Sequence, residues 1–141
     1  MNYEDYHTHP LNKFIHFICI PLIVLTSCNL LSKVRYNYGN YYIELQEFIT
    51  ILMLINYLTY GVFTFLVMFF YFYVINTLSM VCRKNKNCMK YSFYIFVLAW
   101  ILQFFGHYIE GNRPALMTSI YQSFTEAPLF SLEYILPFKI H

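Results

Sequence analysis

Three long stretches of this sequence lack charged side chains, and they constrain the fold more than any other feature. Residues 14–31 contain no acidic or basic side chain apart from His16, and residues 91–109 contain none apart from His107. Between them, residues 48–81 form a run of 34 residues without one charge. An α-helix of about 18 residues rises roughly 27 Å, which is close to the thickness of the hydrocarbon core of a bilayer. The stretches therefore predict helices that cross a membrane.

The composition also argues against a soluble protein. Hydrophobic residues make up 59% of the chain and charged residues only 11%, whereas an ordinary globular domain has roughly 25% charged residues. Too few polar side chains are present to cover a surface in water, so lipid has to cover much of this one. The formal net charge of +2 provides no basic patch of the kind that nucleic acid requires. We expect a lipid bilayer, and no nucleic acid, among the partners.

The central apolar run of residues 48–81 is too long for a single span. As one straight helix it would measure about 51 Å, well beyond the thickness of a bilayer core. We predict a hairpin of two short helices that turns near residues 56–61, the first helix starting near Tyr42. Glu44 and Glu47 would then lie at the membrane interface.

The sequence thus predicts a single all-α domain over residues 1–141, a polytopic membrane bundle of about four transmembrane helices. A basic loop separates the last two spans, and its members are Arg83, Lys84, Lys86 and Lys90. By the positive-inside rule, this loop and the loop with Lys33 and Arg35 would face the cytosol. Residues 115–138 predict a C-terminal amphipathic segment of one or two helices at the interface.

The four cysteines are Cys19, Cys28, Cys82 and Cys88. Two lie in an apolar run and two flank the basic loop, without CxxC spacing and without a small secreted scaffold around them. This pattern favours buried free thiols, while a zinc site or a disulfide stays open as an alternative.

Polar side chains gather at the start of the first span, in the text YHTHPLNKFIH. Pro10 suits the first position of a helix. In that helix Asn12 and His16 are four residues apart and share one face, and His9 lies seven residues before His16 on the same stripe. His7 precedes the helix and can fold back toward it.

A second polar stripe ends the last span, where Gln103, His107 and Glu110 are spaced four and three residues apart. With four spans, the start of the first and the end of the last lie on the same, lumenal, side of the membrane. The histidines of both stripes can therefore meet, which is costly at membrane depth unless they pair or bind something. A single interfacial histidine is usually structural, but this group predicts a metal site. Imidazole suits Zn, Cu, Fe and Ni, so the residues alone do not name the metal.

Four short texts, in this order, resemble a known family. They are HTHPLNKFIH at residues 7–16, WILQFFGH at 100–107, RPAL at 113–116 and APLF at 127–130. The pattern is similar to that of a small membrane family of iron-dependent 2-hydroxy fatty acid dioxygenases. Its fungal member acts in fatty acid alpha-oxidation during phytosphingosine breakdown. Together with the spans between the texts, the resemblance covers nearly the whole chain.

The resemblance implies an enzyme of the endoplasmic reticulum membrane that uses Fe(II) and O2. Its substrate would be a long-chain 2-hydroxy fatty acid, which it would shorten by one carbon. Carried over by position, the candidate metal ligands are His7, His16, His107 and, ranked below these three, His9.

The resemblance also implies catalytic roles for Arg113, Glu110 and Asn12, which match other polar positions of the family. Three imidazoles on Fe(II) leave three octahedral positions, two for the hydroxyl and carboxylate of the substrate and one for O2. Arg113 could hold the substrate carboxylate by paired hydrogen bonds. Glu110 could orient a histidine or ligate the metal itself.

Two other classes of protein stay open, a non-catalytic membrane scaffold and a small metal-binding or transport protein. In a scaffold, replacement of the histidines would change folding and abolish no chemistry. A transporter would more readily show paired repeats and helices broken at mid-membrane, whereas the polar residues here gather at one end of the spans.

Overall fold

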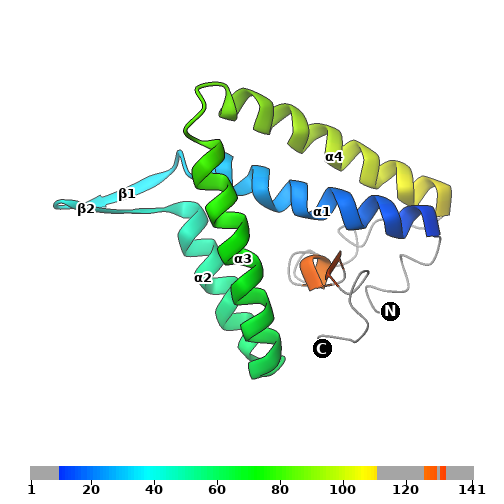
Figure 1. Ribbon diagram of the computed structural model, residues 1–141, viewed down its shortest axis with the longest axis horizontal. Helices are drawn as coiled ribbons and strands as arrows, with labels where there is room; N and C mark the ends of the chain where they lie inside the picture. Colours follow the sequence, from blue (N-terminus) through cyan, green and yellow to red (C-terminus); the bar gives the residue numbers. More distant parts are fainter. Residues whose placement is uncertain (1–9, 111–125, 130, 133–141) are drawn as a thin grey trace. The chain divides into compact units, whose positions relative to one another are not determined.

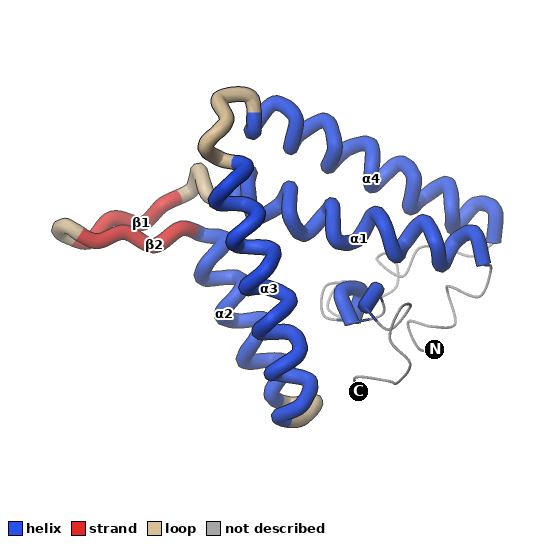
Figure 2. Tube along the Cα trace, in the orientation of Figure 1, coloured by secondary structure: helices blue, strands red, loops and turns tan. Residues whose placement is uncertain are grey.

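The computed structural model describes residues 10–110, 126–129 and 131–132, with the side chains of Asn12 and Glu110 excepted. Its elements, in chain order, are α1 (Pro10–Leu31), β1 (Arg35–Tyr38), β2 (Tyr41–Glu44), α2 (Leu45–Leu58), α3 (Val62–Cys82) and α4 (Cys88–Glu110) (Figure 1). Residues 126–129 and 131–132 are also helical. Figure 2 shows that helix dominates and that the two strands form one short ribbon.

Three of the described helices are long and apolar enough to cross a membrane, at Lys13–Leu31, Val62–Cys82 and Cys88–Ile109. Many of their large apolar side chains are exposed, such as Phe70 at 68%, as expected of helices that face lipid. The prediction of an all-α membrane bundle is confirmed. The remaining predicted span, α2, has 14 residues and therefore a length of about 21 Å, short of the roughly 30 Å of a bilayer core.

The predicted hairpin in the central apolar run is present. α2 ends at Leu58 and α3 begins at Val62, within the expected turn, and the two helices pack against each other (Figure 1). Gly61 has a φ of +122°, which glycine adopts without the steric cost that a Cβ atom would add. A glycine is therefore the residue that lets the chain reverse between the two helices.

The predicted start of the first central helix near Tyr42 is wrong, because residues 35–44 form a β-hairpin. Its register pairs Arg35 with Glu44 and Tyr38 with Tyr41, which leaves Gly39 and Asn40 as a two-residue loop. Gly39 has a φ of +61°, and no described residue other than glycine has a positive φ. Glycine at the first loop position is the requirement of a type II′ turn, whose twist matches that of a hairpin.

α3 shows how the spans divide their surface between protein and lipid. Its buried side chains follow one another at intervals of four, four, three and four residues: Thr64, Met68, Phe72, Ile75 and Ser79. Such spacing places them on one stripe of the helix. The stripe begins and ends with small polar side chains, which allow close approach of neighbouring helices in membranes.

The chain divides into two compact units, which we describe separately. The first comprises residues 1–23 and 97–140, and the second comprises residues 24–96. Each unit thus takes one half of α1 and one half of α4. The prediction of one domain over the whole chain stays a prediction.

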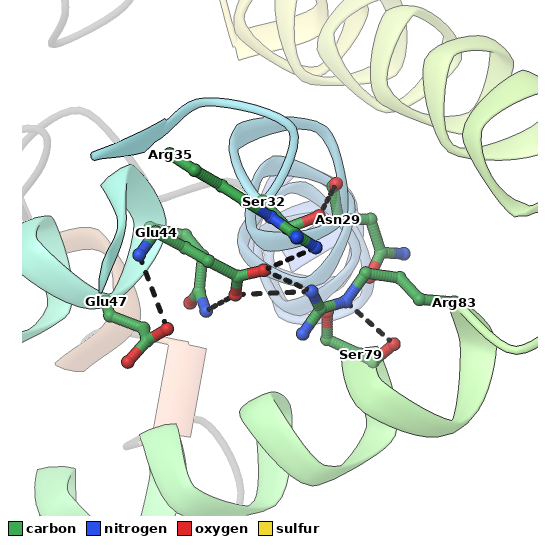
Figure 3. A network of polar contacts seen from close by, with 8 residues as sticks. Asn29, Ser32, Arg35, Glu44, Glu47, Ser79 and Arg83 are labelled. Carbon is green, nitrogen blue, oxygen red and sulfur yellow. Dashed lines mark hydrogen bonds and ion pairs between the residues drawn. The ribbon is translucent and has the colours of Figure 1, made fainter. Parts of the chain in front are cut away.

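The second unit has a polar core that joins three helices. Asn29 of α1, only 1% exposed, donates from Nδ2 to Ser92 Oγ of α4 at 3.0 Å, and Ser79 Oγ of α3 donates to Asn29 Oδ1. Beside it, the Arg83 guanidinium lies against the Glu44 carboxylate (Figure 3). Buried polar groups are thereby paired across helices, as an apolar environment requires.

Candidate metal centre

The first unit brings two of the predicted metal ligands together. His16 lies on α1 and His107 in the last turn of α4, and their ring centroids are 4.9 Å apart with an interplanar angle of 83°. The two residues are 91 positions apart in the sequence. Both are buried, with exposed fractions of 1% for His16 and 4% for His107. The two predicted polar stripes therefore meet at His16 of the first stripe and His107 of the second.

The packing of the two helices explains why these imidazoles are shielded. On α1, His16 shares its buried face with Cys19 and Ile20, three and four residues later. On α4, His107 follows Gln103 by one helical turn, and Gln103 is 7% exposed. His16 on α1, and Gln103 and His107 on α4, are thus buried, and water has little access to them.

Gln103 adds a second polar group to this region. Its Nε2 is buried and has no hydrogen-bond partner among the residues that the structure describes. A buried amide nitrogen without a partner costs about 1–3 kcal/mol, so such groups usually bind something. Gln103 is a candidate contact of whatever occupies this region, a role that its spacing from His107 already suggests.

A short C-terminal helical piece is also tied to this unit. Ser131 Oγ donates to the backbone oxygen of Phe17 at 3.3 Å, and Ser131 is 2% exposed. Leu129, two residues earlier, is fully buried. Phe17 follows His16 directly, so Ser131 lies close to the histidine-bearing turn of α1. The sequence patterns do not single out Ser131, because a serine within a mixed segment carries no periodic signal.

The other predicted site residues cannot be placed in the same way. His7, His9 and Arg113 lie outside the described residues. Asn12 and Glu110 belong to α1 and α4, four residues before His16 and three after His107, but their side chains also lie outside the description. In residues 10–110, 126–129 and 131–132, no group of three or more potential ligands gathers.

The centroid distance between the two histidine rings is compatible with a shared metal ion, and it equals that of an ordinary edge-to-face ring contact. A metal–nitrogen bond measures roughly 2.1 Å, and the centre of an imidazole ring lies roughly 1.1 Å beyond its nitrogen. For an N–metal–N angle of about 90–109°, the two ring centroids would then be about 4.5–5.2 Å apart. The observed 4.9 Å lies in that range. Imidazoles are suitable ligands for iron, but two of them leave a site incomplete, and a third ligand has to come from elsewhere in the chain.

Comparisons with known proteins bear on this arrangement. A family described as "2-hydroxy-palmitic acid dioxygenase Mpo1-like" matches residues 1–138. The chain belongs to the Mpo1-like family. A curated relative, the 2-hydroxy-palmitic acid dioxygenase MPO1 of Saccharomyces cerevisiae, is 30% identical over 129 residues, which cover 91% of this chain and 72% of the relative. No solved structure matches.

The Mpo1-like match confirms the family that the four short texts indicate. It extends over all four of them, from HTHPLNKFIH to APLF, and over the spans between them. His16 and His107, which the structure brings into contact, belong to the first and second of these texts.

Proposed function

We propose that this protein oxidises long-chain 2-hydroxy fatty acids with Fe(II) and O2 and shortens them by one carbon, in the endoplasmic reticulum membrane. One observation carries the proposal. Two buried imidazoles lie 4.9 Å apart where two apolar helices meet, in a chain whose family is described as 2-hydroxy-palmitic acid dioxygenase Mpo1-like. The named relative supports a 2-hydroxy fatty acid as the substrate class.

In this proposal His16 and His107 hold the iron, and His7 supplies the third imidazole. His9 is a fourth candidate, ranked below the others. Fe(II) would supply a binding position for O2 and a charge that favours deprotonation of the substrate hydroxyl. The burial of His16 and His107 keeps bulk water from these imidazoles, which strengthens every electrostatic contact made there.

The chain's other residues would bind and orient the substrate. Arg113 would hold the carboxylate through two parallel hydrogen bonds. Glu110 would accept a hydrogen bond from a histidine N–H and fix the orientation of that ring, or ligate the iron itself. Asn12, one turn before His16, would act as a polar contact at the same level of α1. The apolar side chains of the spans suit the hydrocarbon tail.

The atoms balance if one substrate and one O2 give the shortened acid, one CO2 and one water. The test is to incubate the purified protein with Fe(II), O2 and a long-chain 2-hydroxy acid and to measure the shortened acid. O2 consumption should match product in a ratio of about one to one. Absence of product from well-folded, iron-loaded protein would contradict the proposal.

Variants connect the activity to the histidine pair. We expect His16→Ala and His107→Ala to lose both iron and activity, because removal of one ligand typically lowers metal affinity by orders of magnitude. Cys19→Ala is the matched control, since Cys19 is 3% exposed and lies one turn after His16 on the same face. This variant should keep its iron and most of its turnover.

The two rival classes give different results in the same experiment. In a scaffold, the histidine variants would lower thermal stability, and the wild type would form no product. A metal transporter would bind iron and carry it across the membrane, which flux measurements in vesicles would detect. It would form no shortened acid. Either result would replace the dioxygenase proposal.

A further inference from the structure

Two cysteines of the second unit lie in direct contact. Cys82 ends α3 and Cys88 begins α4, and their sulfur atoms are 2.8 Å apart. Two non-bonded atoms of this size ordinarily stay at least roughly 3.5 Å apart, while a disulfide bond measures about 2.05 Å. The distance thus lies about midway between a bond and an ordinary contact, and both residues carry free thiols.

The backbone of the turn holds the pair in place. The Asn85 N–H donates to the Cys82 carbonyl at 3.0 Å, and the Cys88 N–H donates to the Asn85 carbonyl at 3.1 Å. A hydrogen bond from the Asn87 N–H to Asn85 Oδ1, at 2.8 Å, supports the same turn. The two thiols thus face each other across a turn with internal hydrogen bonds, so little chain entropy remains to be lost on bond formation.

The two thiols differ in their access to solvent. Cys82 is half-buried, whereas Cys88 is buried with an exposed fraction of 4%. Cys82 Sγ accepts a hydrogen bond from Asn29 Nδ2 at 3.6 Å, and Cys88 Sγ lies 3.8 Å from Ser92 Oγ. A small reagent can therefore reach Cys82 first, and Cys88 is placed to attack the product.

A shared metal ion fits this geometry less well than a disulfide. Two thiolates on one tetrahedral zinc, at about 2.3 Å from the metal, would hold their sulfurs roughly 3.7 Å apart. The observed contact is nearly an ångström shorter. Within the part of the chain that the structure describes, no third ligand joins the pair.

We propose that Cys82 and Cys88 form a redox-active dithiol that small-molecule disulfides, such as oxidised glutathione, convert into an intramolecular disulfide. The Cys82 thiolate attacks one sulfur of oxidised glutathione, forms a mixed disulfide and expels one glutathione thiolate. The Cys88 thiolate then attacks the Cys82 sulfur, forms the Cys82–Cys88 bond and expels the second glutathione. The two cysteines lose two electrons and two protons, and both glutathione molecules leave as thiols.

Contact between the two thiols makes the second step effectively intramolecular, which favours the closed disulfide over the mixed one. The positive charges of the turn predict that it faces the cytosol, where glutathione keeps most thiols reduced. The disulfide would therefore form when the cytosol becomes oxidising and reverse when it recovers.

The test uses the full-length protein in detergent or vesicles, equilibrated with mixtures of reduced and oxidised glutathione. Free thiols are blocked at low pH, and the protein is then denatured and digested with trypsin. Because Arg83, Lys84 and Lys86 separate the cysteines, digestion puts Cys82 and Cys88 on different peptides. We expect a linked pair of these peptides that dithiothreitol separates, with Cys19 and Cys28 still blocked as free thiols.

Two variants sharpen the result. Cys88→Ser should stop after the first step and retain one glutathione on Cys82, whereas Cys19→Ser should behave like the wild type. If the wild type keeps four free thiols in fully oxidised glutathione, the proposal is wrong. A disulfide that joins Cys82 to another chain, to Cys19 or to Cys28 would overturn it equally. If Cys88→Ser fails to fold, peptide mapping of the wild type still shows whether the Cys82–Cys88 disulfide forms.

Discussion

Arg83 Nη1 donates to both carboxylate oxygens of Glu44, at 2.9 Å to Oε2 and 3.2 Å to Oε1 (Figure 3). The Glu44 side chain is 6% exposed and that of Arg83 is 18% exposed. Arg35 Nη2 lies 3.6 Å from Glu44 Oε2, and Gln46 Nε2 donates to Oε1 at 3.0 Å. One carboxylate thus connects the β-hairpin, the start of α2 and the end of α3.

Removal of one charge from this pair should destabilise the protein. We expect Arg83→Gln to lower the free energy of unfolding by about 2–4 kcal/mol, because it leaves a largely buried carboxylate without its main partner. Lys86→Gln is the matched control, since it removes one positive charge from the same turn at an exposed position. Unfolding curves in mixed detergent micelles measure both changes. Equal stability of the two variants would contradict the buried-pair argument.

The Asn29 amide of α1 should contribute more to stability than a local hydrogen bond just after the end of this helix. Asn29→Ala removes the contacts to Ser79 and Ser92 on two other helices, and interhelical hydrogen bonds in membranes contribute about 0.6–1.7 kcal/mol each. We expect a loss of about 1–3 kcal/mol in the free energy of unfolding. Among the described residues, Ser32 Oγ bonds only to the Asn29 carbonyl three residues earlier, so Ser32→Ala should cost about 1 kcal/mol or less, below the cost of Asn29→Ala. The same micelle titrations test the pair.

The two ends of the proposed site should label from one side of the membrane. Single cysteines at Thr8 and Asn112, in a background without native cysteines, should react with an impermeant maleimide added to the same face of sealed vesicles. A cysteine at Lys86 should react from the other face, because the positive-inside rule puts the basic loop in the cytosol. Labelling of positions 8 and 112 from opposite faces would exclude a shared site.

Arg113 tests whether the proposed enzyme recognises the substrate carboxylate. Lysine keeps the charge and loses the bidentate geometry, so we expect Arg113→Lys to lower turnover about tenfold or more while iron content stays unchanged. An arginine that serves only as an interfacial anchor would tolerate lysine, because either cation can lie among headgroups. Product formation from a long-chain 2-hydroxy acid, measured beside iron content, separates the two roles.

Much of the fold could be predicted from the sequence, because charge-free length is a direct signal of membrane spans. The turn at Gly61 could also be placed, since a charge-free run much longer than the bilayer core is thick has to reverse. The hairpin of residues 35–44 could have been found from RYNYGNYYIE, in which aromatic strand formers flank Gly39 and Asn40. The predicted helix start near Tyr42 instead gave the end of the second strand, Tyr42 to Glu44, to a helix.

The partners of the buried polar groups could not be predicted in the same way. Asn29 bonds to residues 50 and 63 positions away, and helices that are apolar all round give no signal of which face turns inward. His16 and His107 could be matched because both belong to polar stripes at the ends of spans. The metal-binding and catalytic roles of all the candidate site residues remain predictions.

The single buried stripe of α3 also limits what evolution can and cannot change. The other positions of α3 need only an apolar side chain that is compatible with lipid, and Leu, Ile, Val and Phe are about equally suitable. Substitutions among these residues should therefore accumulate almost freely on the lipid side, while Thr64, Met68, Phe72, Ile75 and Ser79 change together with the helices that they contact. We therefore expect most differences between this chain and its 30% identical relative to lie on the lipid-facing side of α3.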